Sequence, residues 1–314
     1  MTSVNLRGTI PALIVPMRAD YSIDYDAFRR YLEWVVSHGP VAVAVNVDTG
    51  ENGYLTTEER VEVIRVARGI CIGVCAVVAG IAGPGTAGAV GEAQRAAEAG
   101  ADALLVFSSP AFLNDPLDIA IAVDYHEAIA SASGLPLILF NLGRLFGGVP
   151  YDDDTLERLL ELPSVVGLKD ASFDAQRFLR VRDLVRGAGK VLLNGNDNFL
   201  LEALLLGADG GLLGFGAVGV GLLKELHQAV KDRDFEQAAS LQPKVQGFCD
   251  FIYGRPLGNY RARCKVALAQ IGVISPDVTY VRPPFQSLWD REHKDALEAV
   301  RAAGLHRDAA NLAG

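Results

Sequence analysis

The segment Ser164–Ser172, with the sequence SVVGLKDAS, sets the pattern for the whole chain. It reads as a short buried strand that ends in a lysine and is followed by an acidic, hydroxyl-bearing turn. The chain has seven lysines, and only Lys169 ends an apolar, strand-like run. Burial disfavours the charged ammonium and lowers its pKa, and a partly neutral lysine can form a Schiff base with a carbonyl. The alternative is a lysine that reaches from the strand end into water.

Similar apolar runs recur along most of the chain and alternate with amphipathic helical patterns. The runs are short and apolar throughout, which is typical of parallel strands buried on both faces. Eight such units within about 220 residues predict a (β/α)8 TIM barrel. An open, doubly wound sheet is the alternative, but eight evenly spaced strands favour closure. The predicted strands are Thr9–Val15, Val41–Val47, Val74–Ala79, Ala103–Phe107, Leu135–Phe140, Ser164–Lys169, Lys190–Leu193 and Gly211–Gly214.

Helical periodicity fills the segments between these strands. In the first segment, apolar residues recur at 28, 31, 32 and 35, and Asp24 is the predicted cap. The other predicted helices are Thr57–Ile70, Ala87–Ala99, Leu117–Ala130, Asp153–Glu161, Asp174–Arg186 and Phe199–Leu206.

The pattern becomes purely helical from about Glu225. We therefore expect residues 1–224 to form the barrel and residues 225–314 to form a C-terminal helical extension packed on it. The predicted helices of the extension are Phe235–Ile252, Tyr260–Ile271 and Arg291–Ala303.

Composition narrows the classes of function. The 314 residues are 50% hydrophobic, with a formal net charge of −9, which argues against nucleic acid or an anionic membrane as partner. No apolar run is long enough to suggest a membrane span, and the N-terminus lacks the apolar core of a signal peptide. Cys71 and Cys75 lie among apolar residues and are expected to pack as small hydrophobes. These features favour a reduced, cytoplasmic protein.

In such a barrel the chemistry belongs at the carboxyl ends of the strands. The loop 46–53 follows the second strand, where the Thr49 hydroxyl and backbone N–H groups around Gly50 are suited to a substrate carboxylate. The alternative is a polar loop whose Asp or Thr caps a helix. After the fifth strand, Asn141 offers an amide and Arg144 a guanidinium for a carboxylate. The alternative for Arg144 is an exposed loop arginine.

Two glycine-rich segments are further candidate binding sites. Residues 83–88 match G-x-G-x-x-G but lie in the third unit, so we predict that Thr86 caps a helix rather than that the segment binds a dinucleotide. The glycines of 209–216, Gly214 among them, would either bring backbone amides to a phosphate or keep the barrel mouth open. The five histidines are scattered and show no metal-ligand spacing.

Together these residues resemble the dihydrodipicolinate synthase/N-acetylneuraminate lyase family over nearly the whole chain. The resemblance implies that Lys169 forms a Schiff base with pyruvate or a related 2-oxo acid and that the Thr49 loop holds the carboxylate. It also implies a homo-oligomer, a tetramer or dimer, and no metal or organic cofactor. The matching segments are Gly8–Ala12, Thr49–Glu51, Leu55–Arg60, Gly100–Ala103, Gly167–Asp170, Asn194–Asp197 and Gly207–Gly210.

The chain departs from the family at its proton relay. Phe140 stands where the family has its usual catalytic tyrosine, and Asp48 replaces the first threonine of a Thr-Thr pair. The aromatic pair after the fourth strand reads Pro-Ala-Phe at residues 110–112. Arg144 is one position off the family's arginine.

We expect a Schiff-base lyase or aldolase that acts on a 2-oxo acid and an aldehyde, with Gly195 and Gly214 as further substrate contacts. Asp48 is the candidate acid–base group, with its pKa raised by an apolar setting near Phe140 and lowered by a charged lysine. Tyr54 and Tyr151 are fallback hydroxyls. Two alternatives stay open: the family's synthase activity with a rearranged relay, and a catalytically silent protein that binds 2-oxo acids.

Overall fold

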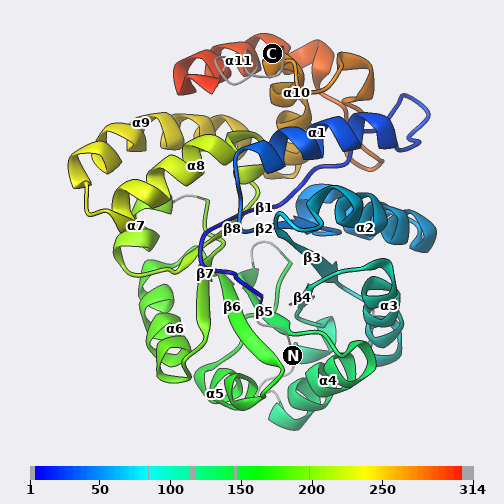
Figure 1. The fold of residues 1–314 in the computed structure, drawn as a ribbon, viewed down its shortest axis with the longest axis vertical. Coiled ribbons are helices and arrows are strands. Elements are labelled where there is room, and N and C mark those ends of the chain that lie inside the picture. The colour runs from blue at the N-terminus through cyan, green and yellow to red at the C-terminus, as the bar shows by residue number, and fades with distance from the viewer. Residues whose placement is uncertain (1–3, 84, 114–117, 145–146, 198, 306–314) are drawn as a thin grey trace.

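A single sheet of eight parallel strands forms the centre of the molecule (Figure 1). The computed structural model describes residues 4–83, 85–113, 118–144, 147–197 and 199–305. The strands are β1 (Thr9–Pro11), β2 (Ala42–Val45), β3 (Ala76–Ile81), β4 (Ala103–Phe107), β5 (Leu137–Leu142), β6 (Val165–Ala171), β7 (Val191–Asn194) and β8 (Gly210–Leu213).

The sheet closes on itself into a barrel. Neighbouring strands pair in the order β1-β8-β7-β6-β5-β4-β3-β2. A parallel bridge between Ala12 and Ala44 joins the two ends of this series, and the Leu13 N–H donates to the Ala44 carbonyl at 2.9 Å. The predicted (β/α)8 barrel is confirmed, and the open sheet considered as its alternative is wrong.

Burial on both faces explains why the strands are apolar throughout. In β5, Ile138 and Phe140 belong to the cluster inside the barrel, whereas Leu137 and Leu139 belong to the cluster between the strands and the helices. This alternation fills the interior of the barrel with apolar side chains. Polar side chains at the carboxyl ends of the strands can then line a site.

The strand that carries Lys169 runs further than its sequence suggested. Lys169 pairs with Phe140 of β5 and Leu193 of β7, and the ladder continues through Asp170 and Ala171. The prediction that the lysine ends its strand is therefore wrong by two residues. Because Ala171 belongs to the inner cluster and residues two apart share a face, the Lys169 side chain points into the barrel.

Eight helices accompany the strands in the described part of the barrel. Asp24 caps α1 as predicted, since its carboxylate accepts from the Ala27 N–H. Thr86 is the first residue of α3 and not its cap; Gly85 occupies the cap position without a side-chain bond. The helices are α1 (Tyr25–Ser37), α2 (Thr57–Cys71), α3 (Thr86–Ala99), α4 (Ile119–Ser133), α5 (Asp153–Glu161), α6 (Ala175–Gly187), α7 (Leu200–Leu205) and α8 (Gly216–Lys231).

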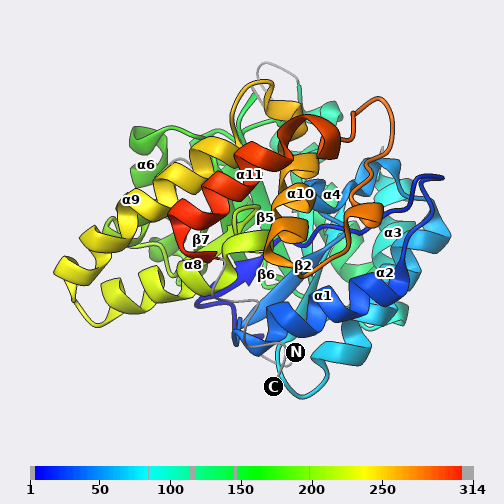
Figure 2. The same cartoon turned by 90° about the horizontal axis from the view of Figure 1, so that it is seen from above.

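Three more helices, α9 (Phe235–Ile252), α10 (Tyr260–Ile271) and α11 (Trp289–Ala303), form the C-terminal extension. Both ribbon views show them together beside α8 (Figures 1 and 2). The boundary expected after residue 224 falls within α8, and the purely helical part begins after that helix. None of the described helices is both long and apolar enough to cross a membrane.

Candidate active site

A cavity of about 680 Å³ opens where the carboxyl ends of the strands meet the C-terminal extension. Most of its wall is apolar and a few polar side chains lie in it, as is usual for sites that bind small molecules. Among the residues that line it are Thr49, Phe140, Lys169, Asp197, Tyr253 and Tyr260.

Lys169 lines this cavity and is 8% exposed. Its Nζ lies 4.2 Å from the centre of the Phe140 ring, so the amine faces an aromatic wall. Burial lowers the pKa of Lys169 to about 8, against the opposing effects of the Asp197 charge and then the Asp48 charge. About a tenth of this amine is therefore neutral, and nucleophilic, at pH 7, far more than for a lysine at its usual pKa of about 10.4.

Gly195, which follows β7, leaves the room that the lysine side chain occupies. A Cβ at this position would come within 2.5 Å of Lys169 Cε. The Gly195 N–H donates to the Asp170 carbonyl at 2.6 Å, which fixes the backbone beside the lysine. Both Gly195 and Gly214, two of the expected substrate contacts, line the cavity.

The loop after β2 brings Thr49 to the cavity. In the closed strand order, β2 lies across the barrel from β6, which carries Lys169. It folds as two short 3₁₀ turns, η1 (Asp48–Gly50) and η2 (Asn52–Tyr54). Thr49 lines the cavity, as expected of a carboxylate site. Gly50 does not: its N–H donates to the Val47 carbonyl at 3.0 Å, so this amide is already used within the turn.

Asp48 lines the cavity in a setting different from the expected one. Its Oδ2 accepts a hydrogen bond from the Tyr260 hydroxyl at 2.5 Å, and its Oδ1 pairs with Arg261 Nη2 at 2.5 Å. The side chain is 60% exposed. The expected apolar enclosure near Phe140 is therefore wrong, because the first residues of α10 supply polar partners that the local sequence around Asp48 did not indicate.

A buried ion pair fastens the far end of this loop. Glu51 has φ 60°, a left-handed conformation that is costly for a residue with a Cβ. Its carboxylate pairs with Lys265 of α10 at 2.5 Å, both side chains being fully buried, and accepts from the Arg282 N–H at 2.8 Å. These contacts hold Glu51 in its strained conformation and thereby fix the adjacent turn that carries Thr49.

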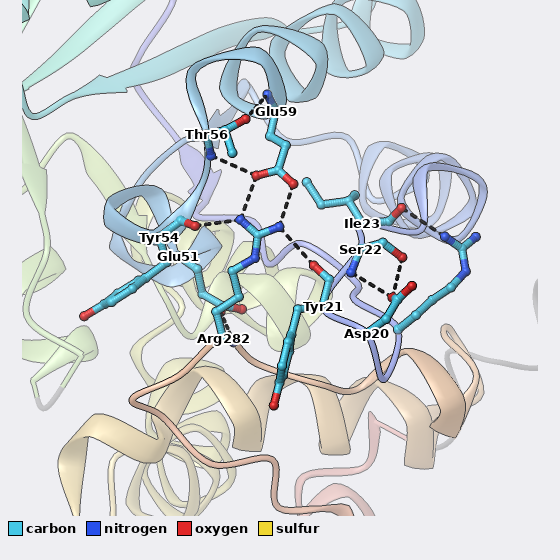
Figure 3. Close-up of polar contacts among 10 residues, drawn as sticks. Asp20, Tyr21, Ser22, Ile23, Glu51, Tyr54, Thr56, Glu59 and Arg282 are labelled. Atoms are coloured by element: carbon cyan, nitrogen blue, oxygen red, sulfur yellow. Dashed lines mark hydrogen bonds and ion pairs between the residues drawn. The ribbon is translucent and has the colours of Figure 1, made fainter.

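Arg282 extends the attachment to the start of α2 (Figure 3). Its guanidinium forms a two-point ion pair with Glu59, at 2.6 and 2.5 Å, and donates to the carbonyls of Tyr54 and Tyr21. Glu59 in turn accepts from the Thr56 N–H as part of the helix cap. The segment after α10 is thus tied to Glu51, to Tyr54 and to the first turn of α2.

The two residues expected after β5 do not reach the cavity. Asn141 is fully buried, where its amide donates to Asp170 Oδ1 at 2.7 Å and accepts from the Tyr151 N–H at 3.1 Å. Both ends of its side chain are therefore used in structure. Arg144 is exposed and does not line the cavity, which agrees with the loop-arginine alternative.

Neither fallback hydroxyl lines the cavity. Tyr151 is buried against His126, and Tyr54 is 37% exposed with its ring edge-on to Phe285. Cys71 lies in the core and Cys75 packs against it, as predicted. Among the described residues, no group of three or more His, Cys, Asp or Glu side chains is arranged to hold a metal ion.

Several polar groups that line the cavity were not predicted from the sequence, among them Asp197, Tyr253 and Tyr260. Asp197 lies in the quoted segment Asn194–Asp197, directly after a predicted strand, which was a usable signal. The two tyrosines come from the extension, after α9 and at the start of α10. Nothing in their local sequence distinguishes them from packing residues.

Comparison with known proteins finds relatives that match nearly the whole chain. The chain is 31% identical over 306 residues to a 4-hydroxy-tetrahydrodipicolinate synthase from Gluconacetobacter diazotrophicus, covering 97% of this chain and 99% of the relative. It is 32% identical over 303 residues to the protein of the same name from Thioalkalivibrio sulfidiphilus, covering 95% and 98%.

A solved structure shows the same relationship. The dihydrodipicolinate synthase from Acinetobacter baumannii, crystallised with pyruvate, superposes with a TM-score of 0.83 at 27% identity and covers 96% of this chain and all of its own. The sequence profile of the dihydrodipicolinate synthetase family matches residues 5–303. The chain belongs to this family and is a Schiff-base aldolase of the class I lyase type.

Proposed function

We propose that this protein condenses Lys169 with pyruvate, or a closely related 2-oxo acid, and uses the resulting Schiff base to make or break a carbon–carbon bond with an aldehyde. The observation that carries the proposal is the partly neutral Lys169 amine, whose pKa is about 8, facing a cavity large enough for both reactants. The Acinetobacter baumannii relative was solved with pyruvate, which supports this choice of acid.

In this proposal Thr49 receives the substrate carboxylate, across the cavity from the lysine. The Tyr260 hydroxyl interacts with both the Asp48 carboxylate and the Thr49 side chain. Asp48 therefore contributes as the residue that orients the Tyr260 hydroxyl beside the carboxylate site. Gly195 and Gly214 complete the substrate pocket, whereas Asn141 and Arg144 are left outside it.

Borohydride trapping tests the proposal directly. Reduction in the presence of pyruvate is expected to add one reduced pyruvate unit to the peptide that contains Lys169, as measured by mass spectrometry. Lys169→Met removes the amine and keeps a side chain of similar length, so it is expected to lose the adduct while remaining folded. A wild-type protein that gives no adduct, or an adduct on another lysine, would refute the proposal.

A second candidate is 4-hydroxy-tetrahydrodipicolinate synthase itself, the name carried by the two curated relatives. Phe140 lines the cavity where a tyrosine would provide a hydroxyl, and this weighs against that activity. General acid–base assistance is typically worth about 10²–10⁴-fold in rate. A coupled assay with pyruvate and aspartate semialdehyde distinguishes the two: turnover there supports the synthase, and turnover only with other aldehydes excludes it.

A homo-oligomer, dimer or tetramer, is proposed from the resemblance alone. The mass of the purified protein in solution tests it.

A further inference from the structure

Polar groups on two sides of the cavity form a row that ends at the Schiff-base lysine. Asp48, Tyr260 and Thr49 lie at the loop end, and Tyr253 and Asp197 lie at the lysine end. Both tyrosines belong to the C-terminal extension. The polar groups of this row therefore come from elements other than β5, the strand that carries Phe140.

Asp197 is the carboxylate in this row that interacts most strongly with the lysine. It is 8% exposed, and its Oδ1 accepts from the Phe215 N–H at 2.9 Å. Burial raises the pKa of Asp197 to about 6, although the Phe215 N–H, the Lys169 charge and the Tyr253 hydroxyl oppose this rise. Near neutral pH this carboxyl is thus poised to accept and return a proton.

Tyr253 links the two ends of the row. Its buried hydroxyl lies close enough to Asp197 to lower the pKa of that carboxyl, yet makes no hydrogen bond of good geometry. A Cβ at Gly214 would collide with this hydroxyl and come within 3.3 Å of Thr49 Oγ1. Tyr253 therefore lies between the carboxylate site and Asp197, with a donor left over for a substrate oxygen.

The other titratable groups that act on Asp197 come from the helices packed above it. They are the thiols of Cys249 on α9 and Cys264 on α10, and burial raises the pKa of both. Both thiols are therefore neutral in the physiological range. Lys169 and Tyr253 are then the neighbours that matter for proton transfer at Asp197.

Building on the proposed function, we propose that Asp197, assisted by the Tyr253 hydroxyl, is the acid–base group of the Schiff-base cycle and replaces the hydroxyl that Phe140 lacks. In the iminium formed from Lys169 and pyruvate, the Asp197 carboxylate removes a proton from C3. The C3–H electron pair forms the C2–C3 double bond, and the C=N pair moves to nitrogen, which gives a neutral enamine. C3 then attacks the aldehyde carbon, and the aldehyde oxygen takes the proton from Asp197. Water hydrolyses the product iminium and frees Lys169, which balances the water released when pyruvate condensed with it. Cleavage is the reverse of these steps.

Exchange of the pyruvate methyl protons in D2O isolates this step, because it requires enamine formation but no aldehyde. Wild-type protein is expected to exchange the methyl protons, as measured by NMR, with a rate at saturating pyruvate that rises as the pH passes through about 6. Asp197→Asn keeps an oxygen for the Phe215 N–H but cannot take the proton. We expect its exchange to fall by about 10²–10⁴-fold while borohydride still traps the imine.

Tyr253→Phe is the second variant and should slow exchange by about tenfold, the loss of roughly one hydrogen bond. Tyr151→Phe is its matched control, since this buried hydroxyl lies outside the cavity and its loss should leave exchange unchanged. Asp183→Asn, an exposed position on α6, is the control for the change of charge. If Asp197→Asn does not fold, the role of Asp197 is decided by the pH dependence of exchange in the wild type and by the exchange rate of Tyr253→Phe.

Failure of the proposed function and failure of the proposed role of Asp197 give different results. A wild-type protein without a trapped imine refutes the proposed function. A trapped imine without exchange, or exchange in Asp197→Asn that equals the wild type, refutes the role of Asp197 and leaves the Schiff base in place. An Asp197→Asn variant that exchanges normally but binds the aldehyde more weakly would make Asp197 a substrate-binding group instead.

Discussion

The pKa of Lys169 is set by burial and by neighbouring carboxylates, which act in opposite directions. Removing its ammonium from water lowers its pKa, and the carboxylates of Asp197 and Asp48 partly restore it. A shift of one pKa unit corresponds to about 1.4 kcal/mol between the two protonation states. The result, about 8, leaves the amine available as a nucleophile without fully abolishing the charge that attracts an anionic acid.

This balance predicts the pH dependence of imine formation. In the proposed reaction the neutral amine of Lys169 is the nucleophile, so the trapping rate at low pyruvate should rise with pH and level off above about 8. Asp197→Asn removes the charge that raises the lysine pKa, so its midpoint should lie below that of the wild type. Borohydride trapping across pH 6–10 measures both midpoints. The exposed Asp183→Asn control should match the wild type, and a wild-type midpoint near 10.5 would contradict the buried setting of the lysine.

At the scale of elements, the turns η1 and η2 depend on a distant helix for their shape. Glu51 is held in a left-handed conformation by Lys265 and by the Arg282 N–H. Burial lowers the pKa of Lys265, while the Glu51 charge and hydrogen bond raise it. A pair buried this completely is costly to form, but removal of one partner costs more, because a lone buried charge remains.

Lys265→Met should therefore destabilise the protein by about 3–5 kcal/mol, as measured by urea unfolding. The double variant Glu51→Gln/Lys265→Met removes both charges and should recover part of this loss. Because Thr49 lies in the adjacent turn, the single variant should also need more pyruvate for half-maximal trapping. Lys231→Met, at the exposed end of α8, is the control. A single variant as stable as this control would mean that the pair does not hold the loop.

The same elements show what the sequence could predict and why the rest was missed. In short apolar strands and amphipathic helices, the local sequence pattern indicates which side chains are buried. The eight strands were therefore predicted, and α9 and α10 were predicted with their observed bounds. The position of Lys169 and Thr49 at one cavity could be predicted because the strand ends of a barrel converge; their roles stay predictions. Asp48 and Tyr260 are 212 residues apart, and no local pattern encodes that contact. Asn141 was misjudged because Asp170, a polar neighbour on the next strand, uses its amide.

At the scale of the whole molecule, the barrel and the extension share their core and their site. The ring of Phe215, the residue before α8, lies edge-on to Phe248 of α9, with 5.7 Å between centroids. The ion pairs of Glu51 with Lys265 and of Asp48 with Arg261 cross the same boundary. One hydrophobic cluster includes residues of both parts. A domain with a single core unfolds as a unit, whereas a separate appendage would melt on its own.

The two tryptophans of the chain allow this to be measured, since Trp34 lies in α1 of the barrel and Trp289 begins α11 of the extension. Trp289→Phe leaves Trp34 as the reporter, and Trp34→Phe leaves Trp289. Trp34 is 1% exposed, so its replacement will cost stability, and each variant is therefore compared with its own far-UV circular dichroism. We expect the fluorescence and circular dichroism midpoints in urea to coincide in both variants. If the Trp289 signal changes at lower urea than the circular dichroism of the same variant, the extension unfolds first. The extension would then be an independent unit, and the tyrosines it contributes to the cavity would be present only while it is docked.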